Sequence, residues 1–104
     1  MPATWANRAT FEYDGNIPTG TTIRYGEDLS YSQTVTADQW TALLAQFQGR
    51  SVELGTSFDA PPPNSIGEWW KNTFHAAPLM SYMGPILVLE GFAQRNDDGT
   101  IQIF

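Results

Sequence analysis

The sequence contains no cysteine and only one histidine. Without cysteine, the chain can form no disulfide bond and has no thiolate metal ligand or cysteine nucleophile. A zinc site would need several carboxylates besides the single imidazole of His75, and no ligand pair at helical spacing surrounds that residue. The cysteine content therefore carries no information on the redox compartment, and we predict no metal and no cofactor.

Basic side chains are also scarce. Five lysines and arginines stand against 11 acidic residues, which gives a net charge of −6. Nucleic acids and anionic membrane surfaces are bound through cationic side chains, so we expect neither as a partner. The longest apolar run, residues 85–89, is far shorter than the ~20 residues that span a bilayer. Residues 1–8 contain no apolar stretch of signal-peptide length. We therefore expect a cytoplasmic protein.

The length and the apolar content indicate one folded domain. The chain has 104 residues, and 41% of them are hydrophobic. A chain of this length matches one typical domain and can bury enough surface for one core. We expect residues 1–104 to form a single domain.

The first third of the sequence has the pattern of β-strands. Aromatic and β-branched residues alternate with polar ones over residues 9–13 and 22–25, and residues of one parity over 29–35 share a face. A period of two is typical of half-buried strands. Glycine, asparagine and proline cluster within 15–20 and indicate a turn. An antiparallel meander is the simplest arrangement.

The clearest helix is predicted over residues 37–48. Thr36 and Gln39 have the spacing of a capping box, and Gly49 can end the helix in the left-handed conformation. Four large apolar residues follow helical spacing and should be buried on one stripe: Trp40, Leu43, Leu44 and Phe47.

A second helix is predicted over residues 65–74. It follows the proline-rich segment 57–64, which we call the proline loop. Ser65 and Glu68 repeat the capping-box spacing. Three consecutive prolines make the preceding segment a stiff surface loop. The apolar residues of this helix fit one face: Ile66, Trp69, Trp70 and Phe74.

The C-terminal third has two parts with different patterns. Residues 76–91 suit a helix or a buried strand, and Gly84-Pro85 should stop or kink a helix. Residues 96–99 indicate a turn before a strand at 101–104, which makes a hairpin. The predicted fold class is α+β, with an antiparallel sheet from the N-terminal meander and the C-terminal hairpin packed against two or three helices.

The segment 89–95, followed by the turn and the terminal strand, resembles the helix-to-wing passage of winged-helix proteins. This resemblance implies that the helices at 65–74 and 77–90 precede a hairpin wing. The helix at 77–90 would be the one that reads DNA, but it contains no lysine or arginine, and only Arg95 is basic in the wing. Because such a helix lacks the usual means of contacting phosphates or guanine, the resemblance implies a scaffold for protein contact.

The adjacent tryptophans Trp69 and Trp70 are the most unusual local feature. Neighbouring helical residues point about 100° apart, so unequal burial of the two indoles is expected. Either both belong to the core, or one of them contributes to a binding surface, where tryptophan is enriched. His75 is interpreted as a partly exposed residue at the C-terminus of this helix, and no catalytic residue is predicted.

The predicted binding surface is the proline loop with the start of the second helix. A stiff loop presents side chains at little entropic cost. The free N–H groups at the start of the helix could also receive an anion. The predicted site residues are Phe58, Asp59, Trp69 and Trp70, with Tyr82 adjacent.

The composition favours a small acidic, non-enzymatic interaction protein that binds a protein partner or itself through this aromatic surface. Fourteen aromatic residues, four of them tryptophan, are many for one small core to cover. The terminal strand, ending at Phe104, could present an edge for a homodimer. The alternative is a small-molecule binding module or a minor enzyme. Its pocket would be walled by Trp69, Trp70, Tyr82 and Phe58.

Overall fold

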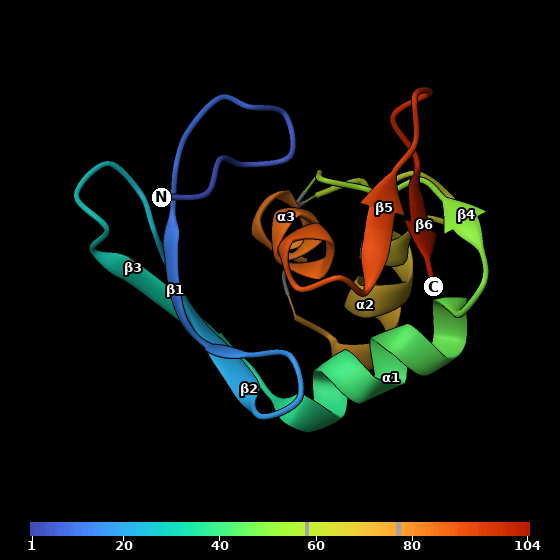
Figure 1. The fold of residues 1–104 in the computed structure, drawn as a ribbon, viewed down its shortest axis with the longest axis horizontal. Helices are drawn as coiled ribbons and strands as arrows, with labels where there is room; N and C mark the ends of the chain where they lie inside the picture. Colours follow the sequence, from blue (N-terminus) through green and yellow to red (C-terminus); the bar gives the residue numbers. More distant parts are fainter. Residues whose placement is uncertain (58, 77) are drawn as a thin grey trace.

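The computed structural model describes residues 1–57, 59–76 and 78–104 and has the α+β architecture that the sequence predicts (Figure 1). None of the helices in these ranges is long and apolar enough to cross a membrane. In chain order the elements are β1 (Glu12–Asn16), β2 (Gly20–Tyr25), β3 (Tyr31–Val35), α1 (Ala37–Phe47), β4 (Ser51–Val52), α2 (Ile66–Phe74), α3 (Met80–Leu89), β5 (Ala93–Arg95) and β6 (Ile101–Ile103).

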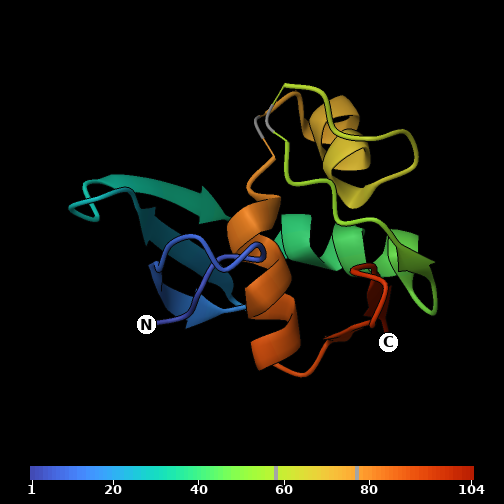
Figure 2. The same ribbon diagram turned by 90° about the horizontal axis from the view of Figure 1, so that it is seen from above.

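The N-terminal sheet is the predicted antiparallel meander, with strand order β1-β2-β3. Its first strand lies later than the predicted 9–13, and Gly15 and Asn16, which were assigned to the turn, pair with Thr21 and Gly20 as part of β1. Ile23 at its centre is buried and stands opposite Gln33 of β3. The shared face predicted for residues 29–35 is buried only at Val35, and both Tyr31 and Gln33 are exposed. The reason is that β3 forms the outer margin of the sheet and its first residues extend beyond the helices (Figure 2).

The C-terminal hairpin forms as predicted, but it belongs to a second, separate sheet with strand order β4-β6-β5. Figure 1 shows α3 between this sheet and the N-terminal one. Because β6 lies in the middle and pairs on both sides, the prediction that the terminal strand presents an edge is wrong. Phe104 itself follows the strand, and its N–H donates to Phe92 O at 3.0 Å.

Helix α1 starts with the predicted capping box. Gln39 N donates to Thr36 Oγ1 at 3.1 Å, and Thr36 N donates to Gln39 Oε1 at 3.0 Å. The helix ends at Phe47, one residue before the predicted end. Three of the four stripe residues are buried, whereas Leu44 is only half-buried. Trp40 also joins α1 to the N-terminal sheet, since its Nε1 donates to Thr21 Oγ1 at 3.2 Å.

Helix α2 is capped by Ser65, whose hydroxyl accepts a hydrogen bond from Glu68 N at 3.1 Å. The second hydrogen bond of the predicted capping box, from Ser65 N to the Glu68 side chain, is replaced by two others. The Glu68 carboxylate accepts from Asn64 N, and Ser65 N donates to Pro62 O. The proline loop is thereby closed onto the start of the helix.

Residues 76–91 contain helix α3, so the helical interpretation is correct and the stop expected at Gly84-Pro85 does not occur. Pro85 leaves the carbonyl of Ser81 without its usual N–H donor within the helix. Trp5 N supplies that donor at 2.9 Å, from a segment far away in the sequence. A Cβ at Gly84 would collide with Leu54 and lie 2.9 Å from Trp5 Cε3. Gly84-Pro85 is thus a docking point for the N-terminal segment.

From α1 onward, the element order α1-β4-α2-α3-β5-β6 with sheet order β4-β6-β5 resembles a winged helix. The N-terminal sheet is an addition to this winged-helix-like arrangement, and it packs on α3. Tyr82 of α3 stacks on Tyr25 at a centroid distance of 4.8 Å and meets Phe11 edge-on at 5.4 Å. Glu90, which follows α3, accepts hydrogen bonds from Tyr13 Oη and Ile17 N, both at 2.9 Å.

Candidate functional site

The proline loop is tied to α2. Phe58, the first predicted site residue, lies outside the described residues. Asp59 is exposed, and its backbone carbonyl accepts a hydrogen bond from Lys71 Nζ at 2.8 Å. Ser57 Oγ accepts from Ala60 N at 3.1 Å, which makes a local turn. The bond from Lys71 holds the loop against the helix, and the exposed Asp59 side chain faces solvent.

The two tryptophans of α2 are unequally buried, as their spacing predicts. Trp70 is 3% exposed, and its ring lies 4.6 Å from that of Phe74, so it belongs to the core. Trp69 is half-buried and meets the ring of Phe47 edge-on at 5.5 Å. Its open side borders a groove of about 210 Å³ between α1 and α2. Of the pair, only Trp69 can touch a partner without rearrangement of the core.

Tyr82 lies in a different part of the molecule. Its ring packs on Phe11 and Tyr25, and it borders a groove of about 340 Å³ that also includes Glu27. The aromatic partners of Trp69 are instead residues of α1 and α2. The structure therefore does not assemble the wall that was predicted from Trp69, Trp70 and Tyr82.

The N-terminal amides of α2 are occupied by the protein itself. Ile66 N donates to Glu53 O at 3.1 Å, and Gly67 N donates to Leu54 O at 2.9 Å. A Cβ at Gly67 would collide with the carbonyl of Gly55, so the glycine permits this close approach. The expectation of a free anion site at this helix start is wrong, because these donors bind the segment after β4.

His75 ends α2 with a left-handed conformation (φ 52°) and is exposed. This placement agrees with the structural interpretation drawn from the sequence. Within residues 1–57, 59–76 and 78–104, no group of three or more histidine, aspartate and glutamate side chains is placed to hold a metal ion.

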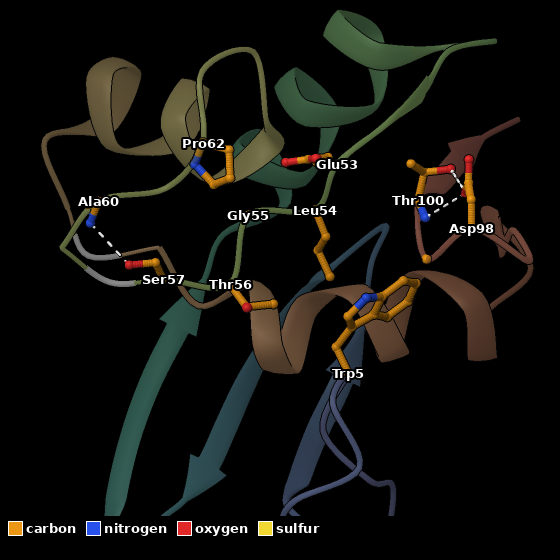
Figure 3. Close-up of a pocket in the computed structure, with 11 residues that line it drawn as sticks. Trp5, Glu53, Leu54, Gly55, Thr56, Ser57, Ala60, Pro62, Asp98 and Thr100 are labelled. Atoms are coloured by element: carbon orange, nitrogen blue, oxygen red, sulfur yellow. Dashed lines mark hydrogen bonds between the residues drawn. The ribbon is translucent and has the colours of Figure 1, made fainter.

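A groove of about 390 Å³, lined by polar and apolar surface alike, lies between the segment after β4 and the β5–β6 turn (Figure 3). Its two carboxylates belong to Glu53 and Asp98, and Trp5 forms part of its wall. Asp98 Oδ1 accepts hydrogen bonds from Thr100 Oγ1 at 2.6 Å and from Thr100 N at 2.9 Å, and these bonds lower the pKa of Asp98. Asp98 thus shapes the hairpin turn, which leaves Glu53 as the carboxylate available in the groove.

A more apolar groove of about 460 Å³ lies on the other side of Trp5, between the N-terminal segment and α3. Val88 is 37% exposed and Leu89 is 62% exposed. The lining residues are Pro2, Ala3, Thr4, Trp5, Asn7, Pro85, Val88, Leu89 and Arg95. We call this site the α3 groove. None of the described residues that line it is acidic, although the chain has 11 acidic residues.

Among the residues that the structure places around the α3 groove, Arg95 is the one that carries a charge. Its Nη1 donates to Trp5 O at 2.6 Å, and its guanidinium carbon lies 4.1 Å from the centroid of the Trp5 ring. In the described part of the chain, the only ion pairs join Arg24 to Glu12 and Asp14. The positive charge of Arg95 is therefore held in place without a neighbouring carboxylate.

The α3 groove was not predicted, although one signal for it is in the sequence. Consecutive residues of a helix point in all directions around the axis. Once 85–89 is known to be helical, its unbroken apolar run must place some side chains away from the core. The other wall, formed by residues 2–5, has no such signal, because it depends on docking between distant segments.

Comparison with protein-family models, with curated proteins and with solved structures finds no match to this chain, so its geometry alone supports the function proposed below.

Proposed function

We propose that this chain is a protein-interaction module that holds a segment of a partner protein in the α3 groove. The observation that carries the proposal is the exposure of Val88 and Leu89 beside Pro85 and Trp5. Contiguous apolar surface of this kind, bordered by polar residues, is characteristic of protein contact sites. Burying Leu89 against a partner would remove from water the most exposed side chain of this helix.

The charge of the groove indicates the chemistry of the partner segment. A guanidinium has five N–H donors, and Arg95 uses Nη1 for Trp5 O. The remaining donors can bind a carboxylate in a bidentate manner, and the stacking on Trp5 holds the guanidinium plane in place. We therefore propose that the segment carries one or two apolar side chains next to an aspartate or glutamate.

The walls of the groove are organised before a partner binds. Trp5 is held by the bond from its N–H to Ser81 O and by the bond from Arg95 to its carbonyl. Gly84 leaves room for its indole. A site that needs little rearrangement loses less entropy on binding, which favours a short peptide segment as ligand.

The packing of α3 also supports a protein partner rather than a nucleic acid. In the position that resembles a recognition helix, α3 carries no lysine or arginine and packs against the N-terminal sheet. DNA readout needs such a helix to enter the major groove with donors for base edges. The cover provided by the sheet leaves α3 its apolar edge at Val88 and Leu89 for contact.

A library of random 12-residue peptides displayed on phage, selected against the full chain, tests the proposal. We expect enriched peptides with an apolar residue within two positions of a carboxylate. Leu89→Asp should weaken their binding at least tenfold, since it places a charge in the groove, and Arg95→Lys should weaken it several-fold by removing the bidentate fork. Trp69→Ala is the matched control and should leave the affinity unchanged.

Two results would overturn the α3 groove as the site. The first is equal binding of the enriched peptides to the wild type and to Leu89→Asp. The second is loss of binding in Trp69→Ala alone, which would return the site to the surface predicted from the sequence. A small carboxylic acid is the alternative ligand. This alternative would be favoured if apolar amino acids with a blocked amino group and a free carboxylate bind as tightly as the 12-residue peptides.

A further inference from the structure

The free edge of β3 is a second surface, on a different element from the α3 groove. We propose that β3 pairs antiparallel with β3 of a second copy, about a two-fold axis, and joins the two N-terminal sheets into one six-stranded sheet. This inference is independent of the proposed function. It assigns self-association to an edge strand rather than to an aromatic surface.

The exposure of β3 supports a free edge. Every residue from Tyr31 to Thr34 is exposed, and β3 pairs with β2 on one side only. In Figure 2 its outer side faces away from β1 and β2 at the margin of the sheet. Edge strands expose unpaired N–H and C=O groups, which another strand can bind.

The composition of β3 contains none of the usual protection against pairing. Natural edge strands are shielded by charged side chains, proline or a bulge, whereas β3 reads Tyr-Ser-Gln-Thr-Val. The opposite margin of the same sheet differs, because β1 carries Glu12 and Asp14. Arg24 pairs with both carboxylates and leaves one net negative charge at this margin, whereas β3 carries no charge. In a chain with a net charge of −6, an uncharged edge is where two copies can approach most easily.

The length of β3 selects one register. A two-fold axis through Gln33 pairs all five residues of each copy, with Tyr31 opposite Val35 of the second copy and Ser32 opposite Thr34. Directly opposed residues share a face, so the hydroxyls of Ser32 and Thr34 meet on one face. On the other face Val35 is buried in its own chain, so the pairing there depends on main-chain hydrogen bonds. A shift by one residue would bring opposite faces of the two sheets together. A closed two-fold pairing uses the edge completely and leads to a dimer, not a fibre.

Two further features affect the strength of the pairing. Tyr31 stacks on Tyr25 at 5.7 Å, and Tyr25 stacks on Tyr82 at 4.8 Å, so a row of rings from α3 supports the edge strand. The acidic residues nearest to β3 in the sequence are Asp28, in the loop before it, and Asp38, in the first turn of α1. Their repulsion across the axis is screened by salt, so the dimer should tighten as ionic strength rises.

Sedimentation equilibrium on the full chain, with charge variants at Gln33, tests the pairing. The wild type should form a species of twice the 11.6 kDa chain mass. Gln33→Lys and Gln33→Glu each place like charges opposite one another and should weaken the dimer at least tenfold. An equimolar mixture of the two variants should restore a dimer, because opposite charges then meet at the axis. Thr41→Lys and Thr41→Glu, at an exposed position of α1, are the controls and should dimerise like the wild type.

A wild type that remains monomeric at about 200 µM, a concentration at which even weak specific pairing is populated, would overturn the proposal. So would dimerisation of Gln33→Lys with wild-type affinity, or failure of the mixed variants to associate. If far-UV circular dichroism shows that the Gln33 variants do not fold, Thr34→Lys, opposite Thr22 in its own sheet, tests the same edge from the opposite face and should also weaken the dimer. Leu89→Asp should leave the dimer intact. Loss of the dimer in that variant would assign self-association to the α3 groove instead.

Discussion

The two sheets of this protein are built in opposite ways. The N-terminal sheet has strands of five and six residues, and each strand pairs with the one next to it in the sequence. The second sheet has strands of two and three residues, and Val52 of β4 stands opposite Ile101 of β6. Local hairpins account for the whole first sheet. In the second sheet only β5 and β6 form a local hairpin, and β4 joins them from a distant part of the sequence.

This difference shows where each sheet is vulnerable. The N-terminal sheet has many hydrogen bonds between its own strands but depends on a few contacts with the helices. In one of them Tyr82 packs against Phe11 and Tyr25. In another, Trp40 donates a hydrogen bond to Thr21. The second sheet has few hydrogen bonds between its strands and depends on the helices that it covers. Substitutions at the links between the regions should therefore cost more than substitutions within either region.

The largest effect is expected for Trp40→Ala. Trp40 is fully buried and joins α1 to β2 through Thr21 Oγ1. Loss of a buried tryptophan should lower the free energy of unfolding by about 3–5 kcal/mol. Denaturant titration followed by circular dichroism measures the change. Trp40→Phe keeps most of the packing and should lose less. Equal losses for the two variants would contradict the assignment of most of the effect to packing.

The next effect is expected for Gly84→Ala, because the added Cβ would collide with Leu54 and press on Trp5. Overpacking of this kind costs about 1–3 kcal/mol. The matched experiment is a double-mutant cycle with Leu54→Ala, which removes the side chain that the Cβ meets. We expect the double variant to lose less stability than the sum of the single variants. Additive losses would show that Gly84 is not needed for this close approach.

A smaller, pH-dependent effect is expected for Tyr13→Phe. Burial and the hydrogen bond to Glu90 raise the pKa of Tyr13 to about 12, from 10.0. The protonated phenol is thus favoured in the folded state. The contribution of Tyr13 to the free energy of unfolding is fully present below about pH 10 and is lost as the pH rises through 12. Near pH 7 the variant should lose about 1.5 kcal/mol, the usual size for a hydrogen bond to a charged group.

Urea titration of the wild type and of Tyr13→Phe at a series of pH values checks this expectation. The difference between the two proteins should shrink between about pH 10 and 12, the range set by the two pKa values. Tyr31→Phe is the control, because the Tyr31 side chain is exposed, and it should show no such convergence. A constant difference over that range would contradict a stabilising role for the protonated Tyr13 hydroxyl.

The smallest effect is expected for the cap of α1, which lies within one region. Thr36→Ala removes the acceptor for Gln39 N and should cost about 1 kcal/mol. Thermal unfolding followed by circular dichroism measures the loss. Thr41→Ala, at an exposed position inside the same helix, should not lower the stability. A Thr36→Ala variant as stable as the wild type would show that Gln39 N finds another acceptor.

The parts of the fold that were predicted correctly depend on neighbouring residues. The capping pair Thr36 and Gln39 starts α1, Ser65 caps α2, and the turn at 96–99 joins β5 to β6. Each of these signals lies within a few positions, and each was found. Of the strand predicted over 29–35, residues 31–35 form β3, whereas Leu29 lies before it in a left-handed conformation. The exposure of β3 was not predicted, because alternation does not reveal how far a sheet extends beyond the helices that cover it.

The candidate site was predicted less well. Trp69 and Trp70 differ in burial as helical geometry requires, but Tyr82 lies elsewhere and the N-terminal amides of α2 are occupied. The α3 groove brings together residues 2–5, 85–89 and Arg95, and no spacing in the sequence connects them. Its charge pattern is visible only when the three segments meet.

Helix caps, turn types, strand alternation and the deficit of basic residues are properties of the sequence, since each depends on residue types within a short window or on a simple count. The continuation of α3 through Pro85, by contrast, depends on the tertiary structure. The carbonyl of Ser81 needs a donor, and that donor is the N–H of Trp5. The separation of the two sheets and the free edge of β3 are of the same kind. Hydrogen bonds and packing between distant segments decide them, and only the folded chain brings those segments into contact.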